Sequence, residues 1–182
     1  MATIGFENVH YAVLTKDDTT GVTYGTPKKL PGAIRLSETM ENNTAELFAD
    51  NRLWATATVF SKGTLEIEMA DISTEDAAAL LGHTVDSSGK IVYNAADVAP
   101  YICLMGEFLK EDGVTKRYFK LLKGQCAESS MEANTKTDSP EFTTVNLTAT
   151  FMPRQYDGDY KYIIDSSTEG SATTIASWYT AV

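Results

Sequence analysis

The sequence predicts a mainly β, antiparallel protein with one short helix, and three observations carry this prediction. The stretch 141–153, EFTTVNLTATFMP, alternates apolar residues with threonine and asparagine, as in a strand with one dry face and one wet face. Segments 98–110 and 114–124 flank an Asp112-Gly113 pair, which is a typical hairpin signal. One stretch, 73–82, combines helix start and stop signals. We therefore expect half-buried strands in an antiparallel sheet, together with a single clear helix.

The N-terminal stretch 6–15, FENVHYAVLT, predicts the first strand, with Val9, Tyr11 and Val13 on one of two largely apolar faces. The following stretch, 16–32, predicts a long loop, because glycine and proline recur throughout it. Loops of this length in compact domains usually carry function or move.

Segments 33–40 and 43–49 predict a weaker strand pair that turns near Glu41-Asn42, and 53–60 predicts a further strand. The large apolar side chains of this region show no clear period. They could fill the core or form an exposed contact surface. These side chains are Leu47, Phe48, Leu53 and Trp54.

The stretch 64–71, TLEIEMAD, alternates cleanly and predicts a strand with Glu66 and Glu68 on its wet face. A helix follows it. Ser73 supplies an N-cap, acidic residues occupy the first turn, and Gly82 supplies a C-cap.

The last part of the chain predicts a C-terminal arm, 165–182. Its acidic, glycine-bearing start, 165–171, predicts a flexible tether. The stretch 172–181 predicts a terminal helix that places Trp178 and Tyr179 on one side.

Composition favours one folded domain, 1–182. The chain is long enough for a sizeable core. We expect no secretion signal, and no apolar run reaches the roughly 20 residues that a membrane span needs. A net charge of −10 argues against a surface that holds phosphate backbones. The two cysteines, Cys103 and Cys126, are too few for a disulfide framework and predict buried free thiols in a cytoplasmic setting.

The sequence offers no catalytic or metal-binding signature, so we expect no enzyme activity, no metal and no cofactor. His10 and His83 are far apart and are expected to be structural, and common hydrolase, zinc and thiol-redox motifs are missing. One alternative function is a monomeric β-sandwich module that binds a carbohydrate or a receptor through Tyr156, Tyr160 and Tyr162. An enzyme of unrecognised type is a further alternative, without a visible pocket motif.

Six segments, in order along most of the chain, resemble the major tail protein (tail tube protein) family of bacteriophages. They are IGFENVHYAVLT, GVTYGTPKKLPGAI, ADISTEDAAALLGH, DVAPYICLMGEF, KRYFKLLKG and TKTDSPEFTTVNLTATFMPR.

This resemblance implies a phage tail tube fold, a β-sandwich or half-barrel with one flanking α-helix, similar to the tube protein of type VI secretion systems. It also implies hexameric rings that stack into the tube of a virion tail, through which genomic DNA passes into the host without specific binding. The implied partners are further copies of the chain and the tail tape measure, initiator and terminator proteins, with no membrane. Assembly would take place in the host cytoplasm.

The resemblance suggests roles for the residues singled out above. Glu66 and Glu68 become candidates for the lumen, although a solvated outer face remains an equal alternative. The regions 16–32 and 41–60, including Leu47, Phe48, Leu53 and Trp54, become candidates for contacts between stacked rings. Trp178 and Tyr179 could dock on the subunit's own core or on a neighbour.

Overall fold

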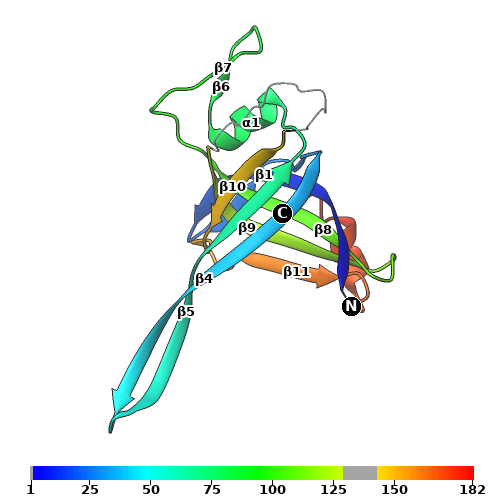
Figure 1. The fold of residues 1–182 in the computed structure, drawn as a ribbon. Coiled ribbons are helices and arrows are strands. Elements are labelled where there is room, and N and C mark those ends of the chain that lie inside the picture. Colours follow the sequence, from blue (N-terminus) through cyan, green and yellow to red (C-terminus); the bar gives the residue numbers. More distant parts are fainter. Residues whose placement is uncertain (1, 129–142) are drawn as a thin grey trace, which may run out of the picture.

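The structure is a computed structural model that describes residues 2–128 and 143–182. Two short helices accompany the strands in this part of the chain (Figure 1). In chain order the elements are β1 (Thr3–Asp18), β2 (Gly21–Tyr24), β3 (Lys28–Lys29), β4 (Ala33–Ala49), β5 (Arg52–Met69), α1 (Thr74–Leu81), β6 (Thr84–Val85), β7 (Ile91–Val92), β8 (Tyr101–Lys110), β9 (Lys116–Ala127), β10 (Val145–Phe151), β11 (Lys161–Asp165) and α2 (Ser171–Ala176).

The main sheet is antiparallel and has the strand order β2-β1-β8-β9-β10-β5-β4, with β3 added to β1 and β11 added to β9. β9 is the strand at which the sheet divides. One of its edges pairs with β8, while the other pairs with β11 through Arg117–Leu121 and with β10 through Gly124–Ala127. The two resulting leaves pack as a β-sandwich, and α1 flanks it.

The main core lies between the leaves. Side chains of β5 and β10 meet those of β1 and β8 there, including the fully buried Leu65, Phe151 and Leu104. A second, smaller cluster lies on the other face of β1, β8 and β9. Its buried members are Ala12, Cys103, Met105 and Leu122. The middle strands are therefore covered on both faces, which explains why they read as nearly continuous apolar runs.

The strand predicted within 141–153 and the hairpin predicted around Asp112-Gly113 are confirmed. β10 buries Leu147, Ala149 and Phe151 on one face, but it is shorter than the predicted 141–153, of which residues 141–142 lie outside the described part. β8 and β9 form the predicted hairpin, with Gly113 at φ 67° in the turn, where glycine adopts a left-handed conformation at little cost.

The helix is confirmed with both of its caps. Ser73 Oγ accepts the Asp76 N–H at 3.1 Å, and Gly82 ends α1 with φ 76°. The buried Asp76 carboxylate also accepts the Tyr11 hydroxyl and pairs with Lys28, each at 2.8 Å. Burial raises the pKa of Asp76, but these contacts outweigh it and hold the pKa below its ordinary value. The helix is thereby tied to β1.

The predicted long loop at 16–32 is wrong. β1 continues to Asp18, turns at residues 19–20 and returns as β2, and β3 follows. The Asp18 carboxylate closes this turn by accepting the Thr20 N–H at 2.7 Å. The glycines and prolines of the stretch lie at turns and strand ends, so they punctuate strands and do not exclude them.

The predicted turn at Glu41-Asn42 is also wrong. β4 passes through these residues with only a bulge, and the chain reverses at Asp50-Asn51, between the paired residues Ala49 and Arg52. Both turn residues have positive φ, 51° and 56°, as a two-residue hairpin loop requires. Asp and Asn tolerate this conformation better than other non-glycine residues.

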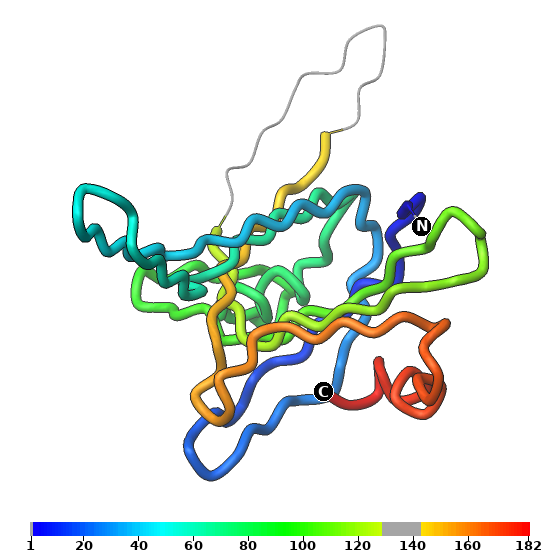
Figure 2. Tube along the Cα trace, turned by 90° about the horizontal axis from the view of Figure 1, so that it is seen from below, coloured from blue at the N-terminus to red at the C-terminus, as the bar shows by residue number. Residues whose placement is uncertain are grey.

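The flexible tether predicted for 165–171 is wrong at its first residue, and the terminal helix is shorter than predicted. Asp165 ends β11 and accepts hydrogen bonds from Arg117 Nε and Lys110 Nζ, each at 2.7 Å. These bonds hold the pKa of Asp165 far below its ordinary value. α2 ends at Ala176, after which the chain turns back to the C-terminus (Figure 2), with Tyr179 and Val182 packed against the smaller core cluster.

Candidate assembly surfaces

The most prominent surface feature is a two-stranded extension, residues 41–62, which we call the arm (Figure 1). β10 pairs with β5 only from Met69 to Gly63. Beyond Gly63, β4 and β5 pair with each other alone in the described part of the chain. A lone two-stranded hairpin is marginally stable in water, so the arm is an element that a further contact would stabilise.

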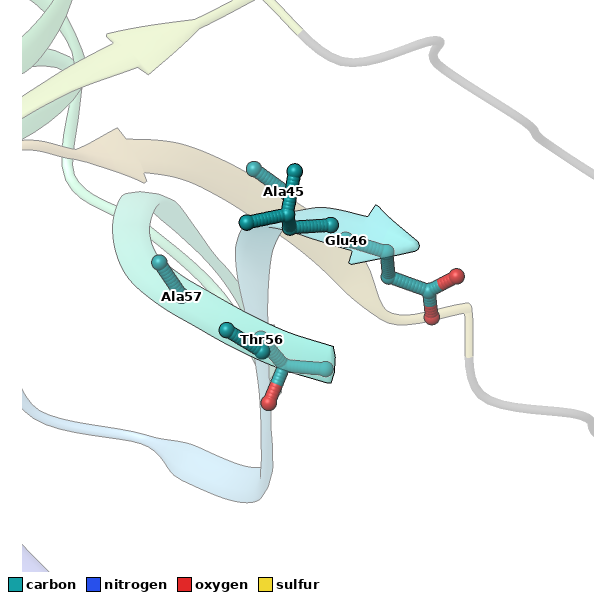
Figure 3. Close-up of a pocket in the computed structure, with 6 residues that line it drawn as sticks. Ala45, Glu46, Thr56 and Ala57 are labelled. Carbon is teal, nitrogen blue, oxygen red and sulfur yellow. The ribbon is translucent and has the colours of Figure 1, made fainter. Parts of the chain in front are cut away.

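One face of the arm is apolar. Opposed residues of an antiparallel pair share a face, and successive residues alternate. The pairs Ala45–Ala57 and Leu47–Ala55 therefore lie on the same face as Val59. Leu47 and Val59 are 58% and 67% exposed. A shallow depression on this part of the arm is lined by Ala45, Glu46, Leu47, Ala55, Thr56 and Ala57 (Figure 3).

The tip of the arm is apolar on both faces. Phe48 is opposed to Leu53, and Trp54 is the extra residue of a bulge beside this pair. Their exposed fractions are 64%, 49% and 59%. The Arg52 guanidinium lies 5.4 Å from the Trp54 ring centroid, a cation–π contact. The interpretation that these side chains, with Leu47, fill the core is wrong, because all four are exposed in the subunit.

Glu66 and Glu68 project from the wet face of β5, away from the core residues Leu65 and Ile67. Glu66 is exposed and Glu68 is half-buried. The Glu68 carboxylate accepts the Thr144 hydroxyl at 2.8 Å. Residues opposed to these two carboxylates on the flanking strands are polar as well: Ser37, Arg35, Thr148 and Asn146. This leaf therefore presents a hydrophilic face on the side away from the sandwich core.

The C-terminal segment docks on the subunit's own sheet. Trp178 is only 4% exposed, and its ring centroid lies 4.6 Å from Lys120 Nζ. Lys120 also donates to the Ala181 carbonyl at 2.7 Å. Tyr179 packs against the smaller core cluster. Of the two positions expected for Trp178 and Tyr179, the structure shows the one on their own subunit.

A buried carboxylate, Glu107, supports this docking and was not identified from the sequence. It is 2% exposed and accepts hydrogen bonds from Asn8 Nδ2 at 2.6 Å, Lys116 Nζ at 2.7 Å and Tyr179 OH at 3.1 Å. Burial raises the pKa of Glu107, but these donors outweigh it and lower the pKa overall. The sequence does contain a signal for it: Glu107 is the single carboxylate in the apolar run YICLMGEFLK. A charge in a buried strand is costly unless it is paired and hydrogen-bonded, so its position indicates a buried polar contact.

The histidines and cysteines occupy separate positions. His10 Nδ1 lies 2.8 Å from the Asn8 carbonyl, and His83 Nδ1 lies 2.8 Å from Asp97 Oδ2. Cys103 and Cys126 are buried free thiols, as predicted, and burial raises the pKa of each to about 12. Among residues 2–128 and 143–182, no three His, Cys, Asp or Glu side chains come together as a metal site would require.

Two of the three tyrosines proposed as a binding platform, Tyr160 and Tyr162, make side-chain contacts within the subunit. Tyr160 stacks on Phe60 with ring centroids 4.0 Å apart. The Tyr162 hydroxyl accepts from Arg154 at 2.6 Å and donates to Asp159 at 2.8 Å. Tyr156 is 49% exposed. The structure thus gives the platform little support.

The fold and its surfaces define a β-sandwich subunit with a two-stranded extension, whose exposed apolar tip has no partner within the described part of its own chain. The sequence profile of a family described as phage tail tube protein matches residues 1–175 of this chain. The chain therefore belongs to the phage tail tube protein family, and its role is that of a structural protein of the virion tail. A search of curated proteins returns no match. No helix in the described residues is long and apolar enough to cross a membrane.

Proposed function

We propose that this subunit assembles into hexameric rings that stack into the tail tube, and that DNA passes through this tube into the host without specific binding. The arm is the observation that carries the proposal. It combines an exposed apolar face with strand edges that lack partners in the described residues. Monomeric proteins rarely keep such features, because they promote association.

Neighbouring subunits within a ring would join through the edge strands of the sandwich. β2 and β4 end the strand order of the main sheet, and each pairs on one side only in the described residues. Pairing between the edges of adjacent copies would remove both edges and continue the sheet around the ring. A head-to-tail contact of this kind closes when the rotation between copies fits a ring.

The arm would make the contact between stacked rings. Leu47, Phe48, Leu53 and Trp54 each keep about half of their surface exposed. Burying the remainder is worth roughly 1 kcal/mol for each side chain, which gives on the order of 4 kcal/mol for each arm. The region 16–32 offers a second contact between rings. It does so through the end of β1, the turn at residues 19–20 and the strands β2 and β3, and not as the predicted loop. Trp178 and Tyr179 are not part of this proposal, because they pack on their own subunit.

The hydrophilic face that carries Glu66 and Glu68 would line the lumen. Carboxylates there would repel phosphates, so DNA would slide without being held, in keeping with the net charge of −10. The remaining partners in this proposal are the tape measure, initiator and terminator proteins of the tail. Assembly takes place in the host cytoplasm. The subunit has no catalytic role and needs no cofactor.

Assembly is tested by negative-stain electron microscopy and sedimentation velocity across a concentration series, with and without a tail initiator complex. We expect rings or hollow tubes from the wild-type chain. Trp54→Ser and Phe48→Ser should prevent them. Val114→Ser is the matched control, because Val114 is 81% exposed but lies outside the arm, in the β8–β9 turn. A chain that stays monomeric even with the initiator would favour the binding-module alternative.

The lumen assignment has its own test. A cysteine placed at residue 66 in assembled tubes should react with a small maleimide but resist a large polyethylene glycol maleimide, while the same residue in free subunits should react with both. The native thiols are buried and should contribute little labelling. Equal reaction of the tube with both reagents would assign Glu66 to the outer face.

A further inference from the structure

The root of the arm carries an aromatic contact between segments far apart in the sequence. The Phe60 ring of β5 and the Tyr160 ring, next to the start of β11, lie with centroids 4.0 Å apart and planes 9° from parallel. Both residues are half-buried, and neither is among the buried residues of the two core clusters. The stack therefore lies at the surface, where the arm leaves the sandwich.

The body side of this contact is held firmly. The Tyr160 carbonyl accepts the Leu122 N–H at 3.0 Å, and the next residue, Lys161, pairs with Leu121 as β11 begins. Lys161 also forms an ion pair with Glu38 of β4. Tyr160 thus reaches the arm from a position fixed on β9, and the ion pair lies close by.

The arm side of the contact lies where the strand pair changes direction. Gly63 is the last β5 residue that pairs with β10. Immediately beyond it, the register shifts from Glu41–Lys62 to Asn42–Phe60, which leaves Ser61 as the extra residue of a bulge. Bulges bend a strand pair and increase its twist. Phe60 is therefore the first paired β5 residue on the outer side of a bend, and its ring is the part of the arm that meets the body.

We propose that Tyr160 is a positioning residue for the arm: by stacking on Phe60 just beyond the bulge, it holds the arm at a fixed angle to the sandwich. Without this contact, the described part of the chain joins the arm to the body through the bulged strand pair alone, and the arm pivots there. The consequence for ring stacking rests on the proposed function, because an arm at a fixed angle presents its apolar tip to the next ring without an ordering cost. The positioning itself is a property of the single subunit.

The first test measures the arm's direction in the free subunit. Spin labels at cysteines replacing Asp50, in the arm's turn, and Val114, in the β8–β9 turn, report their separation by double electron–electron resonance. The wild-type chain and Tyr160→Phe, which keeps a stacking ring, should give one narrow distance distribution. Tyr160→Ala should broaden it at least twofold. Tyr156→Ala is the matched control, an exposed tyrosine of the same loop, and should leave it narrow. A narrow, unshifted distribution for Tyr160→Ala would overturn the proposal.

The second test asks whether the two rings act as a pair. Hydrogen exchange at the amides that join β4 to β5 in the arm is measured for Phe60→Ala, Tyr160→Ala and the double variant. An aromatic pair of this kind predicts roughly three- to tenfold faster exchange for each single variant, with no further increase in the double variant. If the increases in exchange rate of the two single variants multiply in the double variant, the rings do not act through each other, and the positioning role of Tyr160 is refuted.

Tube formation then separates this inference from the proposed function. Tyr160→Ala should raise the protein concentration needed for tubes, and Tyr160→Phe should restore the wild-type value. A loosened arm with an unchanged threshold concentration would refute the positioning role in assembly. If the wild-type chain forms no tubes even with an initiator, the proposed function fails, while the label distances still decide whether Tyr160 fixes the arm.

Discussion

Replacing Gly124 by alanine is the most direct test of how the two leaves pack at β9. Gly124 pairs with Phe151 of β10, and the Phe151 ring, 1% exposed, covers the glycine. A Cβ at residue 124 would lie 2.5 Å from Phe151 Cζ and 2.6 Å from Cδ1. These separations are below any real Cβ contact, so the ring or the strand must move.

The expected cost is at the upper end of the range for overpacking. Several ring atoms are affected and the ring has no exposed side toward which to move, so Gly124→Ala should reduce the free energy of unfolding by about 3 kcal/mol. Phe151→Ala alone should cost about 3–5 kcal/mol through the cavity that it leaves. In the double variant the new methyl group enters the vacated space. The destabilisation of the double variant should therefore be about 2 kcal/mol smaller than the sum of the two single destabilisations.

The assay is urea unfolding followed by circular dichroism, in a Phe48→Ser background, which the proposed function expects to keep the chain unassembled. Gly5→Ala is the matched control within β1, because its Cβ would meet only Leu109 Cβ, at an ordinary 3.5 Å. This control should be neutral or stabilise by up to about 1 kcal/mol. If Gly124→Ala is as stable as the wild type, or if the double variant is strictly additive, the packing described for Phe151 is wrong.

Two further predictions concern stability and its relation to assembly. Asp165→Asn should lower the free energy of unfolding at pH 7 by about 2–3 kcal/mol, because Lys110 and Arg117 lose a shared carboxylate. Because the folded-state pKa of Asp165 lies far below its ordinary value, its stabilisation is complete above about pH 4–5 and falls by up to about 1.4 kcal/mol per pH unit as the pH drops further. Urea titrations at several pH values check this, and an advantage of the wild type that persists undiminished in strong acid would contradict it. The two tryptophans should behave oppositely: Trp178→Ala should destabilise the subunit by about 3 kcal/mol, whereas Trp54→Ala should change its stability by less than about 0.5 kcal/mol and yet impair tube formation, as thermal unfolding and electron microscopy on the same samples would show.

Several elements could be predicted because their signals are local. The α1 caps, Ser73 and Gly82, act within one turn of the helix, and the Asp112-Gly113 turn acts between adjacent strands. The alternation in β10 reports which face is dry, whatever that face packs against. Each of these signals needs only neighbouring residues, so the sequence was sufficient.

The arm could not be predicted in the same way. The sequence predicts a weaker strand pair that turns near Glu41-Asn42, while the chain turns at Asp50-Asn51. Each pair contains at least one residue type that favours turns, Asn42 in the first and Asp50 and Asn51 in the second. The choice depends on the register between β4 and β5, which is set by their pairing over the length of both strands.

The sequence by itself determined the antiparallel β class, the single capped helix, the main hairpin and the family to which the chain belongs. Only the tertiary structure decided that Leu47, Phe48, Leu53 and Trp54 are exposed and that Trp178 is buried. Both sets of side chains are apolar, and the difference is in their neighbours. β10 ends its pairing with β5 at Gly63, so nothing in the described part of the chain covers the tip of the arm. Beneath the C-terminal segment, in contrast, lie Lys120 of β9 and the smaller apolar cluster on β1, β8 and β9. Burial is a property of what lies opposite a residue in space, and local sequence does not record it.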